Sequence, residues 1–212
     1  MYTECIGVDE SGKGDFFGPL VIAACYVGPN EAPQLIGVKD SKKLTDPKAI
    51  QLSRQIKQIC PHTIITIGPA KYNELYEKFA NLNKLLEWGH ARAIENVLEQ
   101  KACSLVISDQ FANPAGLKRA LFEKGKQVQL ESRVRAEEEL AVAAASVLAR
   151  ATFLEKLKKL SEEFEMELPK GAGDQVITAG KKFIKLYKKE ELSKVAKLHF
   201  KTTQKIFALP LY

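Results

Sequence analysis

The sequence of 212 residues lacks several features that would place it in whole classes of protein. No apolar run approaches the roughly 20 residues that a membrane-spanning helix needs. The segment 1–5 has neither the basic region nor the apolar core of a secretory signal peptide. No internal repeat and no low-complexity linker interrupts the chain. These absences predict a cytoplasmic globular protein that does not bind membranes, and we expect a monomer.

Cysteine is also scarce, and the four cysteines are far apart in the sequence: Cys5, Cys25, Cys60 and Cys103. None forms a closely spaced metal-binding pair, and each lies in or beside an apolar stretch. We therefore expect small buried hydrophobic side chains in a reducing compartment. No cluster of histidine and cysteine suggests zinc. His90, beside Trp88, has no second ligand near it and is expected to be structural.

The segment 6–27 contains the most informative pattern in the chain. A short apolar run ends in Asp9 and Glu10, a Gly12-Lys13-Gly14 turn follows at once, and a second apolar run then covers 20–27. The pattern predicts strand, turn, strand. Adjacent strand residues point to opposite faces, so both carboxylates can face one site only if the strand ends there. The glycines can expose backbone N–H groups that suit a phosphate or a sugar hydroxyl.

Two other interpretations compete for this segment. Gly7, four further residues and Gly12-Lys13 nearly complete a phosphate-binding loop, but Gly14 stands where that loop needs Ser or Thr. The motif also requires a helix next, whereas residues 17–27 predict a strand. The remaining alternative is a polar hairpin with solvated charges, and the rest of the chain must decide.

The later elements alternate between helix and strand. Strands are expected at 62–67, 102–107 and 127–130, and helices at 45–59, 71–79, 82–100, 114–123 and from the glutamates at 137–139 to about 164. This order indicates an α/β fold, a mixed sheet with helices packed on it. Asp109 follows a strand, where α/β sheets commonly place functional groups. In the first turn of their helix, the glutamates would also interact favourably with its dipole.

Positive charge is concentrated near the end of the chain. The net charge is +6, and residues 181–205 hold nine lysines against Glu190 and Glu191. Such a patch suggests a polyanionic partner, although a solvated helix face is the alternative. Lys42 and Lys43 could likewise contact phosphate or remain solvated.

Seven segments in order resemble the type 2 ribonucleases H, and ribonuclease HIII most. They are VDESGKGDFFGPLV (8–21), DSKKL (40–44), NLNKLLEWGH (81–90), SDQFA (108–112), AVAAAS (141–146), LPKGAG (168–173) and KLHF (197–200). The resemblance implies a ribonuclease H-like mixed sheet flanked by helices. We expect a catalytic core at 1–165 and a basic helical C-terminal extension at 166–212, packed on the same domain.

The resemblance also implies the chemistry. It makes Asp9, Glu10, Asp109 and Glu137 the ligands of two Mg²⁺ or Mn²⁺ ions, with the register among Glu137, Glu138 and Glu139 left open. Carboxylates that converge repel one another unless cations are bound, and hard divalent cations prefer oxygen ligands. The resemblance implies hydrolysis of the RNA strand of RNA/DNA hybrids by an endonuclease, leaving 3′-hydroxyl and 5′-phosphate ends.

Substrate contacts follow from the same motifs. Ser11, Gly12, Lys13 and Gly14 match the turn that reads a ribose 2′-hydroxyl, and Lys42 and Lys43 are expected to bind substrate. Ribonuclease HII typically has arginine where Lys13 stands and aspartate at the fourth carboxylate. The N-terminal substrate-binding domain usual in ribonuclease HIII is not expected here. The alternatives are cleavage at single ribonucleotides in DNA, as in ribonuclease HII, or a non-catalytic nucleic-acid-binding module.

Overall fold

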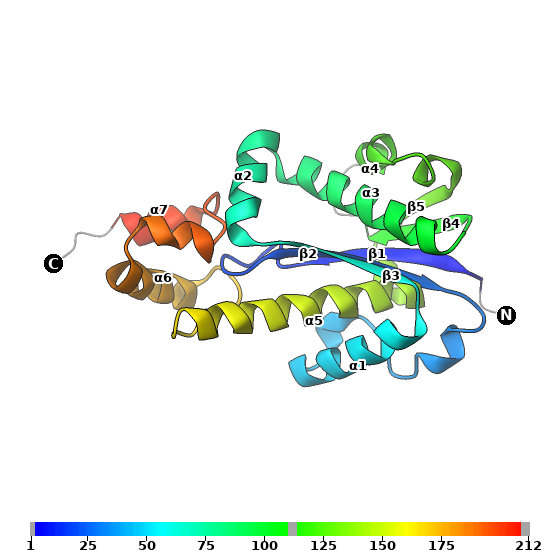
Figure 1. The fold of residues 1–212 in the computed structure, drawn as a ribbon, viewed down its shortest axis with the longest axis horizontal. Coiled ribbons are helices and arrows are strands. Elements are labelled where there is room, and N and C mark those ends of the chain that lie inside the picture. The colour runs from blue at the N-terminus through cyan, green and yellow to red at the C-terminus, as the bar shows by residue number, and fades with distance from the viewer. Residues whose placement is uncertain (1–2, 110–113, 209–212) are drawn as a thin grey trace. The chain divides into compact units, whose positions relative to one another are not determined.

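A computed structural model describes residues 3–109 and 114–208, and these residues form two compact units (Figure 1). The first unit contains the described parts of 1–11, 21–65 and 81–152. The second contains 12–20, 66–80 and the described part of 153–212. The expected division into 1–165 and 166–212 stays a prediction.

A mixed sheet of five strands has the order β3-β2-β1-β4-β5. The strands are β1 (Cys5–Ser11), β2 (Leu20–Val27), β3 (His62–Ile67), β4 (Leu105–Asp109) and β5 (Gln129–Arg133). β1 pairs antiparallel with β2 and parallel with β4, and β4 pairs parallel with β5. This confirms the α/β class that was predicted from the alternation of elements.

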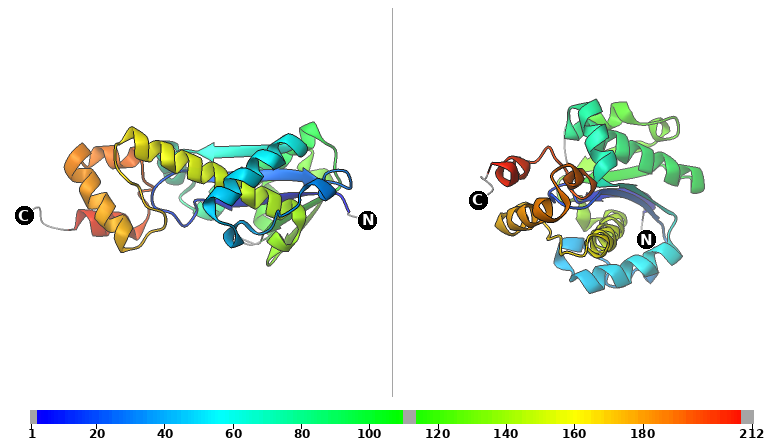
Figure 2. Two further views of the ribbon diagram at one scale, coloured as in Figure 1. Left: turned by 90° about the horizontal axis from the view of Figure 1, so that it is seen from below. Right: turned by 60° about the vertical axis from the view of Figure 1, so that its left-hand side comes forward.

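Helices cover both faces of this sheet in the first unit. α3 (Leu82–Gln100) and α4 (Pro114–Ala120) lie on one face, while α1 (Asp46–Ile59) and the N-terminal half of α5 (Leu140–Glu163) lie on the other (Figures 1 and 2). Short 3₁₀ turns connect these elements: η1 (Ala32–Gln34), η2 (Ser41–Lys43), η3 (Gly125–Gln127) and η4 (Ala136–Glu138).

Two glycines allow the helices to approach the sheet closely. A Cβ atom on Gly7 of β1 would overlap with the backbone of Ala141 and Val142 at the start of α5. A Cβ atom on Gly89 of α3 would overlap with the side chain of Ile22 on β2. Gly7 therefore faces α5 and Ile22 faces α3, which fixes the orientation of every other residue along β1 and β2.

The second unit is mostly helical in the part that the structure describes. It contains α2 (Pro69–Phe79), α6 (Asp174–Tyr187), η5 (Glu190–Lys194), α7 (Lys201–Phe207) and the C-terminal half of α5. Phe183 packs against Phe164 and Tyr187, with ring centroids 5.2 and 5.1 Å away. None of the helices in the described residues is long and apolar enough to cross a bilayer.

Most predicted elements are present, with shifts at their ends. The helix predicted at 82–100 is confirmed as α3, but the strand predicted at 102–107 lies at Leu105–Asp109. The strand predicted from residue 17 begins at Leu20, because Phe17 and Gly18 pair with the C-terminal segment instead. Residues 110–112 of the SDQFA segment lie outside the described residues.

The prediction that three glutamates occupy the first turn of the last long helix is wrong. α5 begins at Leu140, and the carbonyl of Glu139 accepts the hydrogen bond from Ala143 N at 2.9 Å. Glu137 and Glu138 lie on η4 instead, after Arg135 in a left-handed conformation with φ 58°. Their position is thus set by a separate turn rather than by the helix.

Candidate active site

Asp9 and Glu10 lie inside β1, opposite Ala23 and Ile22 of β2. The two carboxylates were expected to end this strand, and β1 continues one residue further, to Ser11. Their side chains therefore leave the sheet on opposite faces. Asp9 shares the face of Gly7, which is covered by α5, and Glu10 shares the face of Ile22, which is covered by α3.

Asp9 is surrounded by groups that oppose its ionisation. Burial raises its pKa to about 7, and the charges of Glu10 and Asp109 add to this effect. Two hydrogen bonds act in the other direction, one from the Ser146 hydroxyl on α5 and one from Glu10 N, which lies 2.8 Å from Asp9 Oδ1. A nearby cation therefore stabilises the ionised form of Asp9 more than it would stabilise the ionised form of an exposed acid.

Glu10 is paired with a buried histidine. Glu10 Oε2 lies 3.1 Å from Nε2 of His90, whose side chain is fully buried in α3. His90 was expected to be structural, and the structure gives it a contact with a predicted site residue. His90 belongs to NLNKLLEWGH, one of the segments that resemble the family, but no residue near it in the sequence indicates that its ring contacts Glu10.

Asp109 and Glu137 come from neighbouring segments. Asp109 is the last residue of β4, and its Oδ1 accepts a hydrogen bond of 3.3 Å from Ala136 N at the start of η4. Because Glu137 directly follows Ala136, the structure brings the third and fourth predicted carboxylates into one region of the first unit.

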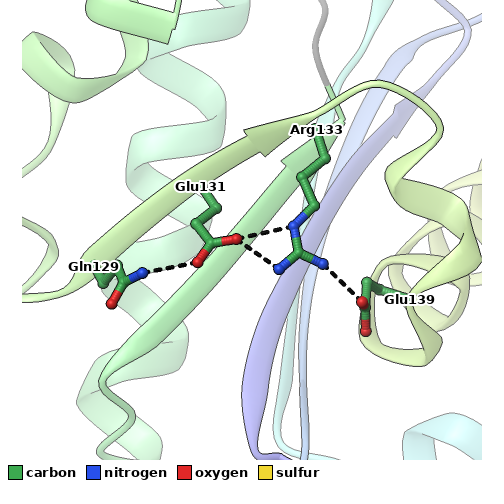
Figure 3. A network of polar contacts seen from close by, with 4 residues as sticks. All are labelled: Gln129, Glu131, Arg133 and Glu139. Atoms are coloured by element: carbon green, nitrogen blue, oxygen red, sulfur yellow. Dashed lines mark hydrogen bonds and ion pairs between the residues drawn. The ribbon is translucent and has the colours of Figure 1, made fainter.

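The three glutamates of the 137–139 run differ in their surroundings. Glu139 Oε1 accepts a hydrogen bond of 2.7 Å from Arg133 Nη1. Arg133 also donates to Glu131 Oε2, at 2.9 Å from Nε and 2.6 Å from Nη2, and Glu131 in turn accepts from Gln129 (Figure 3). Glu138 is exposed and Glu137 is half-buried. Glu139 thus belongs to an ion-pair network, and Glu137 remains the preferred fourth carboxylate.

The predicted ligands fit a hard divalent cation by their chemistry. All four supply carboxylate oxygens, as Mg²⁺ and Mn²⁺ prefer, and the raised pKa of Asp9 indicates an excess of negative charge around it. Within residues 3–109 and 114–208, no three Asp, Glu, His or Cys side chains lie close enough to hold an ion together.

The turn that carries Lys42 and Lys43 is linked to the surroundings of Asp9. Ser41 Oγ lies 2.8 Å from Ser146 Oγ, and Ser146 also bonds to Asp9. Arg150 of α5 donates to the Ser41 carbonyl and, at 2.7 Å, to Asp46 Oδ1. Lys42 and Lys43 themselves are exposed. The sequence did not predict roles for Ser146 and Arg150, because their contacts with Asp9 and Ser41 join residues that are far apart in the chain.

The Gly12-Lys13-Gly14 turn follows Ser11 directly in the chain and belongs to the second unit. Gly12 has φ +86°, and a Cβ atom there would overlap with the Pro19 carbonyl oxygen, so this position requires glycine. No atom lies within 4 Å of a Cβ placed on Gly14, so that side of the turn is open. Lys13 is half-exposed.

The lysines of the second unit do not form one uniform patch. Lys182, Lys185, Lys188 and Lys189 are exposed, and Lys181 is half-exposed. Lys197 is fully buried, so counting it among the surface lysines of 181–205 is wrong.

This strand order, with carboxylates on the adjacent strands β1 and β4, defines a ribonuclease H-like fold. The chain belongs to the ribonuclease HII family, whose profile, described as "Ribonuclease HII", matches residues 6–203.

Curated relatives carry a more specific description. Ribonuclease HIII of Protochlamydia amoebophila is 50% identical over 206 residues, covering 96% of this chain and 68% of that protein. Ribonuclease HIII of Chlamydia pneumoniae is 47% identical over 206 residues, covering 95% of this chain and 69% of that protein.

Solved structures agree with these relatives. Bst-RNase HIII in complex with Mn²⁺ has a TM-score of 0.89 at 34% identity, covering 97% of this chain and 70% of that chain. RNase HII from the PCNA:RNase HII complex of Archaeoglobus fulgidus has a TM-score of 0.80 at 26% identity, with 98% of both chains covered.

Proposed function

We propose that this protein is a metal-dependent endoribonuclease. It hydrolyses the RNA strand of RNA/DNA hybrids with Mg²⁺ or Mn²⁺ and leaves 3′-hydroxyl and 5′-phosphate ends. The observation that carries the proposal is the pair of carboxylates on adjacent strands, Asp9 and Asp109, with the pKa of Asp9 raised to about 7 by burial. Membership of the ribonuclease HII family and the relatives named ribonuclease HIII support the substrate class.

Each predicted ligand has a distinct role. Asp9, Asp109 and Glu137 supply oxygen ligands to a two-ion site, and the Mn²⁺ complex of Bst-RNase HIII supports this choice of ion. Glu10 leaves β1 on the other face, but it stands one residue before the C-terminal end of the strand and its charge already acts on Asp9, so it completes the ligand set from there. When bound, such cations stabilise the attacking and leaving oxygens of a phosphodiester displacement. Ser146 orients Asp9 through its hydroxyl, and His90 orients Glu10 through Nε2.

Substrate recognition falls to glycines and lysines. In the Gly12-Lys13-Gly14 turn, the backbone N–H groups contact a ribose 2′-hydroxyl, the group that distinguishes RNA from DNA. Ser11 precedes this turn, and Lys42 and Lys43 contact phosphate from their own turn on η2. The exposed lysines at 181–189 add contacts to the hybrid backbone.

The proposal is tested by cleavage of a labelled RNA/DNA hybrid in Mg²⁺ and in Mn²⁺. We expect internal cuts in the RNA strand, no cuts without a divalent cation, and a loss of at least a hundredfold in Asp109→Asn. Glu99→Gln, which changes an exposed acid of α3, is the matched control and should retain normal turnover. Normal turnover in Asp109→Asn would refute the ligand assignment.

The same assay separates two substrate preferences. We propose that the protein cuts runs of ribonucleotides in preference to a single ribonucleotide in duplex DNA, because Lys13 is a flexible point charge where ribonuclease HII has the planar fork of arginine. Both substrates are compared in one buffer and one metal. Equal or faster cleavage at the single ribonucleotide would indicate ribonuclease HII specificity instead.

We further propose that the protein acts as a monomer in the cytoplasm. Its four cysteines all lie in the described residues and form no disulfide there, which supports a reducing compartment. Sedimentation of the purified chain tests the oligomeric state, and a dimer at micromolar concentration would contradict it.

A further inference from the structure

Lys197 is a fully buried lysine whose ammonium group is directed at backbone oxygens. Its Nζ atom lies 2.6 Å from the Gly18 carbonyl oxygen, and 3.5 Å from those of Phe17 and Pro19. Burying an ammonium group costs several kcal/mol unless hydrogen bonds compensate. A lysine has three N–H donors, and three carbonyl oxygens surround this one. Burial lowers its pKa to about 7, and only the charge of Asp15 acts in the opposite direction.

All three acceptors belong to the segment 12–20, which begins with the Gly12-Lys13-Gly14 turn. Before Leu20, this segment contains no helix or strand of its own, and at Gly12 and Gly18 it packs against Phe153 of α5. Its backbone is also held by hydrogen bonds, from Gly18 N to the Val195 carbonyl at 2.9 Å and from Lys197 N to the Phe16 carbonyl at 2.9 Å. The C-terminal segment around Lys197 therefore supports the backbone of the segment 12–20 directly.

A second contact holds the other side of the same segment. Phe16 N donates to the Gly171 carbonyl at 2.8 Å, and Gly171 N donates to Asp15 Oδ1 at 2.6 Å. Gly18 has φ +82°, and the segment begins at Gly12 with φ +86°. The backbone of this segment is left-handed at both glycines, and its buried carbonyl and N–H groups need these hydrogen-bond partners to stay in this conformation.

Lys197 is itself fixed in place by α2. Asn73 Nδ2 donates to the carbonyls of Ser193 and Ala196, at 3.3 and 2.9 Å, and Asn73 Oδ1 accepts from Leu198 N at 2.9 Å. The backbone on both sides of Lys197 is thereby anchored. The anchored backbone consequently fixes the position from which the Lys197 side chain extends to the segment 12–20.

We propose that Lys197 is a positioning residue that sets the form of the segment 12–20 and, through it, the reading of the ribose 2′-hydroxyl by Gly12-Lys13-Gly14. This inference rests on the proposed function. Lys197 does not touch substrate or metal; it acts by holding the carbonyl of Gly18 and its two neighbours. Without an ammonium group, the Gly18 carbonyl loses its donor at 2.6 Å and the carbonyls of Phe17 and Pro19 lose a weaker contact, and the cost of a buried unpaired carbonyl favours another path for the segment.

The test measures affinity for an RNA/DNA hybrid and for a DNA duplex of the same length, with Ca²⁺ in place of the catalytic ion. In Lys197→Met, we expect the ratio of hybrid affinity to DNA affinity to fall at least fivefold. Lys197→Gln keeps an N–H donor for the Gly18 carbonyl and should fall between Lys197→Met and the unchanged protein. It also serves as the test variant if Lys197→Met does not fold.

Two controls separate positioning from a general loss of stability. Phe183→Leu truncates a buried ring of α6 that packs on Phe164 and Tyr187, so it destabilises the second unit without touching the segment 12–20. Lys194→Met removes an exposed lysine of the same region. Both should keep the unchanged affinity ratio.

The outcomes are distinct. An unchanged ratio in Lys197→Met, or an equal fall in Phe183→Leu, would overturn the positioning role while the proposed function stands. If the unchanged protein shows no preference for the hybrid and no metal-dependent cleavage, the proposed function fails, and the inference fails with it.

Discussion

Removing the charge of Asp9 should make the metal-free protein more stable while it abolishes hydrolysis. In the folded protein the pKa of Asp9 is about 7, whereas the ordinary pKa of an aspartate is 3.8. Between these values the folded state binds more protons than the unfolded state, so its stability falls as the pH rises. The stability that a neutral Asp9 provides is complete below pH 3.8 and is lost once the pH passes 7.

The size of the effect follows from the two pKa values. A difference of roughly three pKa units corresponds to about 4 kcal/mol at most. Part of the Asp9 residue still reaches solvent, which screens some of this cost, so we expect about 2 kcal/mol in Asp9→Asn at pH 8. Asparagine keeps the shape of the side chain, and its oxygen can still accept the hydrogen bond from Glu10 N.

The assay is thermal unfolding in EDTA at pH 8 and pH 5. We expect Asp9→Asn to melt about 4–8 °C higher than the unchanged protein at pH 8, and to gain less than half as much at pH 5. In Mn²⁺ the order should reverse, because a bound ion stabilises only the protein with an intact site. Glu99→Gln, an exposed change in α3, should have no effect. Equal stability of Asp9→Asn and the unchanged protein at pH 8, or an equal gain at both pH values, would refute the electrostatic account.

Three further predictions follow from particular contacts. Gly7→Ala places a methyl group against the backbone of α5 and should lower the free energy of unfolding by about 3 kcal/mol. Gly14→Ala places a methyl group in open space and should change the free energy of unfolding by less than about 1 kcal/mol. Chemical denaturation measures both values. Glu137→Gln should abolish metal-dependent hydrolysis. Glu139→Gln should lower the stability of the fold and leave most of the activity, because Glu139 is bound to Arg133. Equal mild losses of activity in the two variants would contradict the choice of Glu137. Neutralising the five lysines of the second unit should flatten the slope of log affinity against log salt by up to about one unit per lost phosphate contact, and an unchanged slope would place the hybrid elsewhere. These lysines are Lys181, Lys182, Lys185, Lys188 and Lys189.

The sequence alone determined the chemistry of the predicted site. Asp9 and Glu10 next to a glycine-rich turn, and Asp109 at the end of an apolar run, are local patterns, and backbone propensity and side-chain alternation act over only a few residues. For the same reason the order of strands and helices was predictable, while their ends shifted by one to three residues where a distant segment competed for hydrogen bonds, as at Phe17 and Gly18.

Only the tertiary structure decided which groups surround those residues. Ser146 contacts Asp9, His90 contacts Glu10, and the Cys25 thiol donates to Cys60, although each pair is far apart in the sequence. Lys197 shows the reason most clearly: by composition it belongs with the eight other lysines of a basic segment, yet it is buried against the carbonyls of Phe17, Gly18 and Pro19. Whether a charge faces solvent or a set of backbone oxygens depends on which segments fold against each other, and no local pattern in the sequence records that choice.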